Sequence, residues 1–324
     1  MGTPRFGAIV LEKLAQSEFK PILVITEPDK PAGRKQELKA PECKIIAEKY
    51  NIPVVQPEKI KNLESGILKL EYDLIIVAAY GQIIPKNILE IPKYGCLNVH
   101  PSLLSKYRGP SPIQYAILNR DKETGITIIL MDEKVDHGPI VAQQQLEIPN
   151  SKHQIPNKSK IQNPNYETLE TELAKHGADL LIKTIPNWIS KRIKAEPQNE
   201  SKATLTKIIK KEDGKIDWKK PAEAIEAQIR AFHVWPGTFF EWNGKKIKIL
   251  EAETKELPNK NNYDIGEVIV SPAEALAKAG WNKILVKCGQ NFLIINKLQL
   301  EGKKPTNSEE FLRGHKDFIG TILK

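Results

Sequence analysis

Asn98 and His100 stand two residues apart at the end of a short apolar run, CLNVH, at positions 96–100. If this run is a strand, both polar side chains project from one face at its carboxyl end, where open α/β sheets bind ligands. An amide that donates a hydrogen bond beside an imidazole that exchanges a proton suits a carbonyl carbon that becomes tetrahedral. The pair therefore favours acyl transfer. The alternative is that the two residues only cap the strand and satisfy loop backbone groups.

A second polar cluster follows the next apolar run, in MDEKVDHGPIVAQ at positions 131–143. Asp136 could hold His100 in its working tautomer or take a proton itself. His137 is the rival candidate for the base. An aspartate that only forms a turn before Gly138 is the other interpretation of this loop.

These residues need a scaffold, and the first half of the chain alternates apolar runs with helical patterns. The apolar runs fit strands covered on both faces, and they lie at 21–25, 73–79, 96–100 and 125–131. Helical spacing occupies 41–51, 110–121 and 166–194, the last interrupted by Pro186, which should kink or split that helix. Alternation of this kind predicts an α/β fold with a doubly wound, mostly parallel, Rossmann-like sheet.

The last third of the chain has a different pattern. A polar stretch without periodicity at 195–204 predicts a linker between a catalytic domain at 1–194 and a second domain at 205–324. In the second domain, Asn243-Gly244 between alternating runs is a strong hairpin signal. Further short strands predict a small β-barrel.

Composition narrows the class of protein. The 324 residues are 40% hydrophobic, as in globular proteins, and no apolar run is long enough to span a bilayer. The N-terminus lacks the pattern of a signal peptide, so we expect a cytoplasmic protein with no membrane partner. The net charge of +9 permits a polyanionic partner without requiring one. Cys43, Cys96 and Cys288 lack the spacing of a metal site or a disulfide framework, so we expect inert thiols and no metal.

Taken together, the motifs resemble a known family. CLNVHPSLLSKYRGPSPIQYAI followed by TGITIILMDEKVDHGPIV resembles the formyltransferases that use 10-formyltetrahydrofolate. With GTPRFG, TEPDKPAGR, IVAAYGQIIP, DGKIDW, IRAFHVWPGTFF and EGKKPTNSEEFLRG, the chain is most similar to the methionyl-tRNA formyltransferase family. The resemblance runs from Gly2 to the C-terminal region, apart from 150–165.

The resemblance implies an activity, a set of site residues and, for the C-terminal barrel, an oligonucleotide-binding (OB) type of fold. The implied reaction transfers a formyl group from 10-formyltetrahydrofolate to the amino group of methionine on initiator tRNA, by a chain that we expect to be a monomer. The family's catalytic residues fall on Asn98, His100 and Asp136. The implied folate contacts are Ser102, Leu103, Leu104 and Ser105, with Ala79, Tyr80 and Gly81 lining the pterin pocket. The implied tRNA contacts are Arg34 and Lys35 in an acceptor-stem loop, and Lys207, Lys245, Lys246 and Lys248 in the barrel.

Three features depart from the family pattern. Val234 replaces a usual proline in AFHVWPG, which we expect to be a detail of the fold. Ser105 stands where the family usually has proline, which predicts a looser folate loop. The family also has a β-strand before GTP, of which only Met1 remains here. Because the first strand of a doubly wound sheet lies centrally, its loss predicts unpaired backbone and an apolar gap. The corresponding hypotheses are a start several codons upstream or a defective product.

Three other functions are alternatives to the formylation of methionyl-tRNA. Formylation of a small amine, such as a sugar nucleotide or a purine precursor, uses the same chemistry but does not need an appended basic domain. A tRNA-binding protein with an inactive catalytic domain is disfavoured by the intact Asn98, His100 and Asp136. A dinucleotide dehydrogenase is set aside because no GxGxxG follows a predicted strand.

Overall fold

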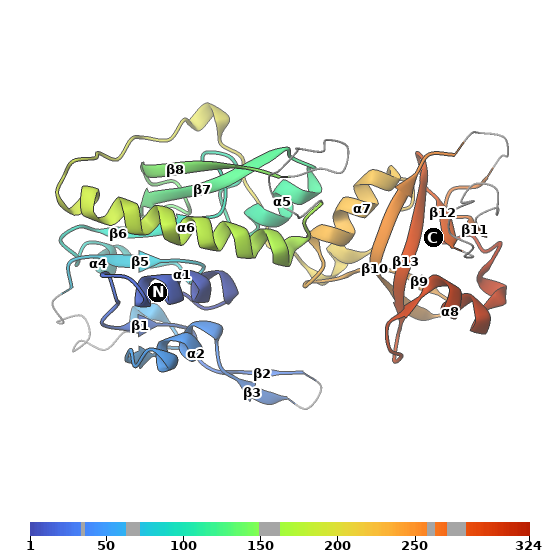
Figure 1. Ribbon diagram of the computed structural model, residues 1–324, viewed down its shortest axis with the longest axis horizontal. Coiled ribbons are helices and arrows are strands. Elements are labelled where there is room, and N and C mark those ends of the chain that lie inside the picture. Colours follow the sequence, from blue (N-terminus) through green and yellow to red (C-terminus); the bar gives the residue numbers. More distant parts are fainter. Residues whose placement is uncertain (34–35, 63–71, 149–162, 258–262, 271–282) are drawn as a thin grey trace. The chain divides into compact units, whose positions relative to one another are not determined.

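The computed structural model describes residues 1–33, 36–62, 72–148, 163–257, 263–270 and 283–324 (Figure 1). The chain forms two compact units, which we call unit 1 and unit 2. Unit 1 holds most residues up to Lys207, and unit 2 holds most residues from Ile208 onward together with Gln114–Asp121. This division falls three residues after the start predicted for the second domain.

Four strands of unit 1 (β1, β5, β6 and β7) form at the predicted apolar runs, and the other four were not predicted. The strands are β1 (Val24–Ile25), β2 (Lys30–Ala32), β3 (Glu37–Lys39), β4 (Val54–Val55), β5 (Ile75–Val77), β6 (Cys96–His100), β7 (Glu123–Leu130) and β8 (Ile140–Glu147). The helices are α1 (Arg5–Ala15), α2 (Glu42–Lys49), α4 (Lys86–Leu89), α5 (Pro112–Leu118) and α6 (Tyr166–Ile189), with 3₁₀ turns η1 (Ile60–Asn62) and η2 (Glu200–Lys202). The second half of α5 groups with unit 2.

The sheet of unit 1 is parallel in its first part and antiparallel at one edge. β1 pairs with β4 in parallel, and β5 pairs with β6 in parallel. The first three residues of the chain lie between these pairs, where Gly2 forms a parallel bridge to Ala78. β7 and β8 then extend the sheet in the order β5-β6-β7-β8, each antiparallel to its neighbour. The predicted run at 125–131 is thus a strand of the antiparallel edge.

Helix α6 lies along the strands of this sheet (Figure 1). A glycine allows its close approach, because a Cβ at Gly177 would stand 2.8 Å from a methyl carbon of Val99 in β6. The helix also continues past Pro186 to Ile189. The predicted split at Pro186 is therefore wrong, and the physical reason is position: the proline lies in the last turn, where few backbone hydrogen bonds remain to be lost.

Unit 2 is built on one antiparallel sheet. Its elements are η3 (Lys211–Gly214), α7 (Ala222–Ala231), β9 (Thr238–Trp242), β10 (Lys245–Lys255), β11 (Val268–Val270), β12 (Ile284–Lys287), β13 (Phe292–Leu300), β14 (Thr306–Asn307), α8 (Ser308–Gly314) and η5 (Lys316–Phe318). The strand order is β11-β12-β13-β10-β9, with β14 on β13. The predicted hairpin joins β9 to β10, and Asn243 and Gly244 both adopt positive φ, as a tight two-residue turn requires. The sheet and its helices make a small barrel-like domain.

The core of unit 2 lies between the sheet and its helices. Trp218 of the chain before α7 meets Phe240 of β9 edge to face, with ring centroids 5.6 Å apart. Phe318 of η5 is fully buried and stacks on Phe240, with ring centroids 6.2 Å apart. These aromatic contacts give unit 2 a hydrophobic core of its own.

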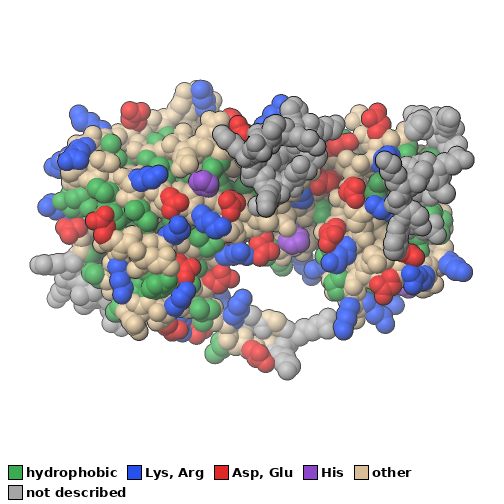
Figure 2. Space-filling model, in the orientation of Figure 1, with side chains coloured by type: hydrophobic (Ala, Val, Ile, Leu, Met, Phe, Trp, Pro, Cys, Tyr) green, Lys and Arg blue, Asp and Glu red, His purple; other side chains and the backbone are tan. Residues whose placement is uncertain are grey.

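The cysteines and the surface charges can be compared with the expectations from the sequence. All three cysteines are buried, and burial raises the pKa of each thiol to about 12, so they are inert at neutral pH as predicted. Figure 2 shows Lys and Arg side chains spread among Asp and Glu side chains over the visible face of each unit. Among the helices of the described residues, none is both long and apolar enough to cross a membrane.

Candidate active site

Strand β6 delivers Asn98 and His100 to the same place as Asp136. Both β6 side chains are buried at the carboxyl end of the strand. Asn98 Nδ2 donates to Asp136 Oδ1 at 3.2 Å, and His100 Nδ1 lies 3.5 Å from the same oxygen. The other carboxylate oxygen, Oδ2, accepts the backbone N–H of Gly109 at 2.8 Å. The structure thus brings the three residues predicted as catalytic together around one oxygen of the Asp136 carboxylate.

The hydrogen-bond partners of His100 restrict its protonation. Nε2 lies 3.0 Å from the backbone oxygen of Tyr107. A carbonyl oxygen only accepts, so Nε2 carries a hydrogen. Nδ1 then faces the carboxylate of Asp136, and two lone pairs would repel one another there. One proton between Nδ1 and Oδ1 relieves this repulsion, so the pair His100 and Asp136 can hold one exchangeable proton.

Three site segments contain a non-glycine residue with positive φ. These residues are Ala79 (50°), Tyr107 (64°) and Asp136 (49°). Left-handed backbone at such residues costs about 1–3 kcal/mol each and concentrates at functional sites, where surrounding contacts hold it in place. Here it turns the Tyr107 carbonyl toward His100 and the Asp136 carboxylate toward β6.

Gln198 provides part of that support, although no chemical motif in the sequence points to it. Its side-chain amide donates to the backbone oxygens of Asp136 and Gly138, at 2.8 Å each. Its Oε1 accepts from Arg108 Nε at 3.0 Å. Arg108 also forms a two-pronged ion pair with Glu200, and these hydrogen bonds hold the pKa of Glu200 below its usual range. In the sequence, Gln198 lies in a run of polar residues without periodicity, and this pattern does not indicate a site residue.

Residues 195–204, predicted as a linker, are therefore tied to the site. Glu196 exchanges backbone hydrogen bonds with Ile140 of β8. Thr204 donates its N–H to Ser105 O and accepts the N–H of Arg108 on its own carbonyl. Arg108 belongs to the same network: its side chain is buried, and its guanidinium is occupied by Gln198 and Glu200.

The predicted folate loop, Ser102 to Ser105, is held by two polar residues of the neighbouring strands β7 and β8. Thr127 Oγ1 donates to the Ser102 carbonyl at 2.7 Å and accepts the Leu104 N–H at 3.1 Å. Gln143 Nε2 donates to Thr127 Oγ1 at 2.8 Å and to the Leu104 carbonyl at 2.9 Å. His100, Thr127 and Gln143 are direct cross-strand partners in β6, β7 and β8. A threonine inside the apolar run GITIILM was the available signal.

The two serines of this loop differ in their bonding. Ser102 Oγ donates to the backbone oxygen of Lys106 at 2.6 Å. Ser105 Oγ is buried, and no hydrogen-bond partner for it exists in the described part of the chain. A buried hydroxyl without a partner destabilises the fold.

The other predicted cofactor segment, Ala79 to Gly81, follows β5. The register of β5 and β6 pairs Val77 with Asn98, so the chain after β5 leaves the sheet at the same end as His100. Ala79 and Gly81 are exposed, whereas Tyr80 is buried. An exposed turn at this end of the sheet can meet the polar edge of a pterin ring through its backbone groups.

His137, the rival base, has other partners. Its Nδ1 lies 2.6 Å from Asp132 Oδ2, and its Nε2 lies 3.6 Å from Glu200 Oε1. The geometry favours His100, which shares Asp136 with Asn98. Among the described residues, no group of three or more His, Cys, Asp or Glu is arranged to hold a metal ion.

Comparison with known proteins identifies the family. The formyl transferase family profile matches residues 1–173, and the profile of the formyl transferase C-terminal domain matches residues 208–316. Methionyl-tRNA formyltransferase of Bacillus velezensis is 40% identical over 325 residues, which cover 100% of this chain and 96% of that protein. The enzyme of Caldicellulosiruptor saccharolyticus is 41% identical over 327 residues, covering 100% and 98%. The chain belongs to the methionyl-tRNA formyltransferase family.

Solved structures agree with this family at the level of the fold. An N-formyltransferase from Helicobacter canadensis, in complex with folinic acid and dTDP-3-aminofucose, is 22% identical, with a TM-score of 0.60 over 91% of this chain and 96% of its own. HypX from Aquifex aeolicus, in complex with tetrahydrofolic acid, is 16% identical, with a TM-score of 0.59 over 98% of this chain and 46% of its own. The similarity extends to distant formyltransferases.

The resemblance to methionyl-tRNA formyltransferases also assigns residues to the tRNA, and we now describe where they lie. Arg34 and Lys35 lie outside the described residues. Lys207 is exposed and belongs to unit 1. Lys245, Lys246 and Lys248 lie on β10 of unit 2, where Lys246 Nζ stands 3.9 Å from the ring centroid of Phe239.

Proposed function

We propose that this protein transfers the formyl group of 10-formyltetrahydrofolate to the amino group of methionine on initiator tRNA. The observation that carries the proposal is the convergence of Asn98, His100 and Asp136 at the carboxyl end of β6, in a chain that matches methionyl-tRNA formyltransferases over its whole length. Relatives named for this activity support the substrate, and the geometry supports the chemistry.

Asn98 is the proposed donor to the developing oxyanion. When the amine attacks the formyl carbon, the carbonyl oxygen gains negative charge. The amide nitrogen of Asn98 carries two hydrogens, and one of them points to Asp136. The second can donate to the oxyanion, while the bond to Asp136 fixes the orientation of the amide. A fixed donor of this kind contributes roughly 10²- to 10³-fold in rate.

His100 and Asp136 are the proposed proton carriers. The attacking amine must lose a proton, and the departing nitrogen of tetrahydrofolate must gain one. The pair holds one exchangeable proton between Nδ1 and Oδ1, which are 3.5 Å apart. It can give this proton to the leaving nitrogen and take another from the amine, so the reaction ends with the pair as it began.

We further propose that Ser102 to Ser105 and Ala79 to Gly81 contact the folate. Support comes from the hydrogen bonds of Thr127 and Gln143 to the first segment, and from the register of β5 and β6, which directs the second toward the same end of the sheet. Both segments can present backbone donors and acceptors to a pterin ring. Distant relatives in complex with folinic or tetrahydrofolic acid support this class of co-substrate.

Unit 2 is the proposed partner of the tRNA. Lys245 and Lys248 are exposed on β10, and ammonium groups that neutralise phosphates release counterions. Binding through them should weaken steeply as salt rises. Replacing both lysines by alanine should raise the Kd for tRNA and flatten its dependence on salt. An unchanged salt dependence would remove these lysines from the tRNA site.

The decisive experiment offers the purified chain 10-formyltetrahydrofolate with methionyl initiator tRNA, or with a sugar nucleotide amine. We expect tetrahydrofolate release with the tRNA and little with the amine. The opposite preference would assign the chain to small-molecule formylation. Tight tRNA binding with no tetrahydrofolate release would indicate an inactive relative.

A further inference from the structure

Unit 2 carries an exposed tryptophan with two exposed aliphatic neighbours. Ile208, Val234 and Trp235 are 70%, 61% and 55% exposed. The indole Nε1 of Trp235 donates to the backbone oxygen of Ile209 at 3.3 Å, so the segment that contains Ile208 lies against the ring. Apolar residues exposed singly are common on protein surfaces, whereas a group that includes tryptophan is typical of a binding surface.

The turn that presents Trp235 is held by several contacts. Residues 232–237 join α7 to β9, and the N–H of Gly237 closes the turn by donating to the backbone oxygen of its first residue at 2.9 Å. Gly214 packs on this turn so closely that a Cβ there would stand 2.1 Å from Gly237 O. The side chain of Gln228 in α7 donates to the two backbone oxygens that flank Gly214. The indole is therefore oriented before any partner binds, which reduces the entropy lost on binding.

Two lysine side chains reach the same turn from β10. Lys246 and Lys248 lie two residues apart on this strand, so both leave the same face of the sheet, about 6.6 Å apart. Lys246 Nζ is 3.9 Å from the ring centroid of Phe239, and Lys248 Nζ would be 3.5 Å from a Cβ on Gly237. Both ammonium groups thus lie over the segment that directly follows Trp235. Neither lysine forms an ion pair within the part of the chain that the structure describes.

An oriented indole beside two such ammonium groups suits a nucleotide whose base is unpaired. A base stacks on an aromatic ring through its flat face, which is free only outside a continuous duplex. The sugar–phosphate chain attached to the base carries the negative charges that lysines attract, and its successive phosphates are spaced much as Lys246 and Lys248 are. An apolar protein surface would cover the indole but would leave the two ammonium groups without opposite charges.

We propose that Trp235 stacks on one unpaired base of the tRNA, and that Lys246 and Lys248 bind phosphates of the same unpaired stretch. This inference rests on the proposed function, because it takes the tRNA as the substrate. Stacking tolerates any sequence, since every base has a flat face. Trp235 therefore adds affinity for single-stranded RNA and does not select a particular base.

Substitutions of Trp235 separate stacking from a general apolar contact. Trp235→Phe keeps a flat aromatic ring, whereas Trp235→Leu keeps an apolar side chain without one. We expect the Kd for methionyl initiator tRNA to rise about fivefold or more in the leucine variant, and less than about threefold in the phenylalanine variant. Because the ring is half exposed, both variants should keep the Tm of the parent chain, and thermal unfolding checks this.

Ile319→Ala is the matched control for the loss of an exposed apolar side chain. Ile319 is 44% exposed and precedes Gly320, which donates to the backbone oxygen of Val268 in β11. The strand β11 is at the opposite edge of the sheet from β9, so the control lies away from the turn of Trp235. This substitution should leave the Kd for tRNA unchanged.

Tryptophan fluorescence tests the stacking without the tRNA or the reaction. A base stacked on an indole quenches its emission, so short single-stranded oligoadenylate should quench the parent chain but not Trp235→Phe. A ribose–phosphate chain of the same length without bases has the same charge, and it should quench neither. Quenching that is equal in the parent chain and in Trp235→Phe would overturn the proposal.

The binding data also distinguish this inference from the proposed function. If the parent chain binds tRNA and Trp235→Leu binds it equally well, the stacking is wrong while the proposed function stands, and the exposed group belongs to a protein partner. If the parent chain does not bind tRNA, both the proposed function and this inference are overturned.

Discussion

The side-chain amide of Gln198 donates a hydrogen bond of 2.8 Å to the backbone oxygen of Asp136, 62 positions away in the chain. Asp136 in turn faces His100 and Asn98. The loop that carries the carboxylate is thus held by a residue that touches none of the other proposed catalytic side chains. Gln198 is a positioning residue, and its effect should appear in turnover rather than in substrate binding.

Gln198→Ala should lower kcat by roughly 10- to 100-fold and leave KM for tRNA nearly unchanged, because the Asp136 loop loses its anchor while the tRNA surface does not. Two backbone oxygens and Arg108 Nε would also lose a buried partner, so the free energy of unfolding should fall by about 2 kcal/mol. Steady-state kinetics and urea denaturation measure both. Gln145→Ala, on an exposed side chain of β8, is the matched control. A rise in KM with normal kcat would contradict the assignment.

Asp136→Asn should reduce kcat by about 10²- to 10⁴-fold, because the side chain keeps its shape but can no longer share a proton with His100. Asp132→Asn makes the same chemical change beside His137 and should cost less than about tenfold. Single-turnover rates with bound tRNA separate the two variants. If Asp132→Asn is the more damaging change, His137 is the base and the proposed roles are wrong.

Ser105→Ala should raise the free energy of unfolding by about 1 kcal/mol, because it removes a buried hydroxyl without a partner. Ser102→Ala should lower it by about the same amount, because its hydroxyl donates to Lys106 O. Chemical denaturation measures both changes in the free energy of unfolding. Because both serines lie in one loop, changes of opposite sign would be specific to the bonding of each hydroxyl. Destabilisation by both substitutions would mean that Ser105 Oγ has a partner in solution.

Stability should rise with pH as the Met1 amino group titrates. Burial lowers the pKa of this group from its ordinary 8.0, so over the window below pH 8 the unfolded chain binds more protons than the folded one. The free energy of unfolding therefore increases with pH there, by at most about 1.4 kcal/mol per pH unit. Nearby Cys43, Cys96 and Tyr72 stay neutral in this window because burial raises their pKa.

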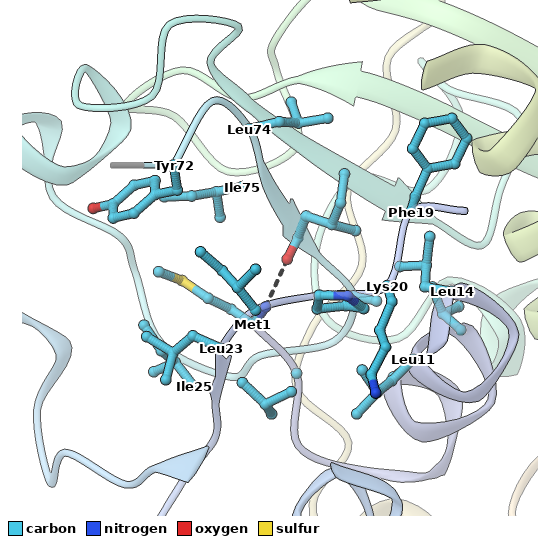
Figure 3. A pocket seen from close by; sticks show the side chains of 18 of the residues that line it. Met1, Leu11, Leu14, Phe19, Lys20, Leu23, Ile25, Tyr72, Leu74 and Ile75 are labelled. Carbon is cyan, nitrogen blue, oxygen red and sulfur yellow. Dashed lines mark hydrogen bonds between the residues drawn. The ribbon is translucent and has the colours of Figure 1, made fainter. Parts of the chain in front are cut away.

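Denaturation at pH 6, 7 and 8 of the free chain and of the Nα-acetylated chain isolates this effect. Lys20 and Asp73 line the same cavity in unit 1 as Met1 (Figure 3). Both chains carry them, so their contribution cancels in the difference between the two free energies of unfolding. We expect the free chain to gain on the acetylated chain as pH rises. A constant difference between the two would show that the amino group reaches water.

The sequence by itself determined the strands and the polar residues that they carry. The apolar runs predicted β1, β5, β6 and β7, because continuous burial leaves a clear pattern, and spacing of two put Asn98 and His100 on one face. Asn243-Gly244 fixed a hairpin, because few residue pairs tolerate its positive φ angles.

Only the tertiary structure decided what supports the site. Thr127, Gln143 and Gln198 act through backbone atoms of distant loops, and a hydrogen bond to a backbone group leaves no side-chain pattern in the partner's sequence. The burial of Arg108 could not be predicted either. A basic residue in a loop has the same local sequence whether it faces solvent or is buried against distant side chains such as Gln198. Pairing across the sheet also depends on segments far apart in the chain, so the position of Met1 between β1 and β5 required coordinates.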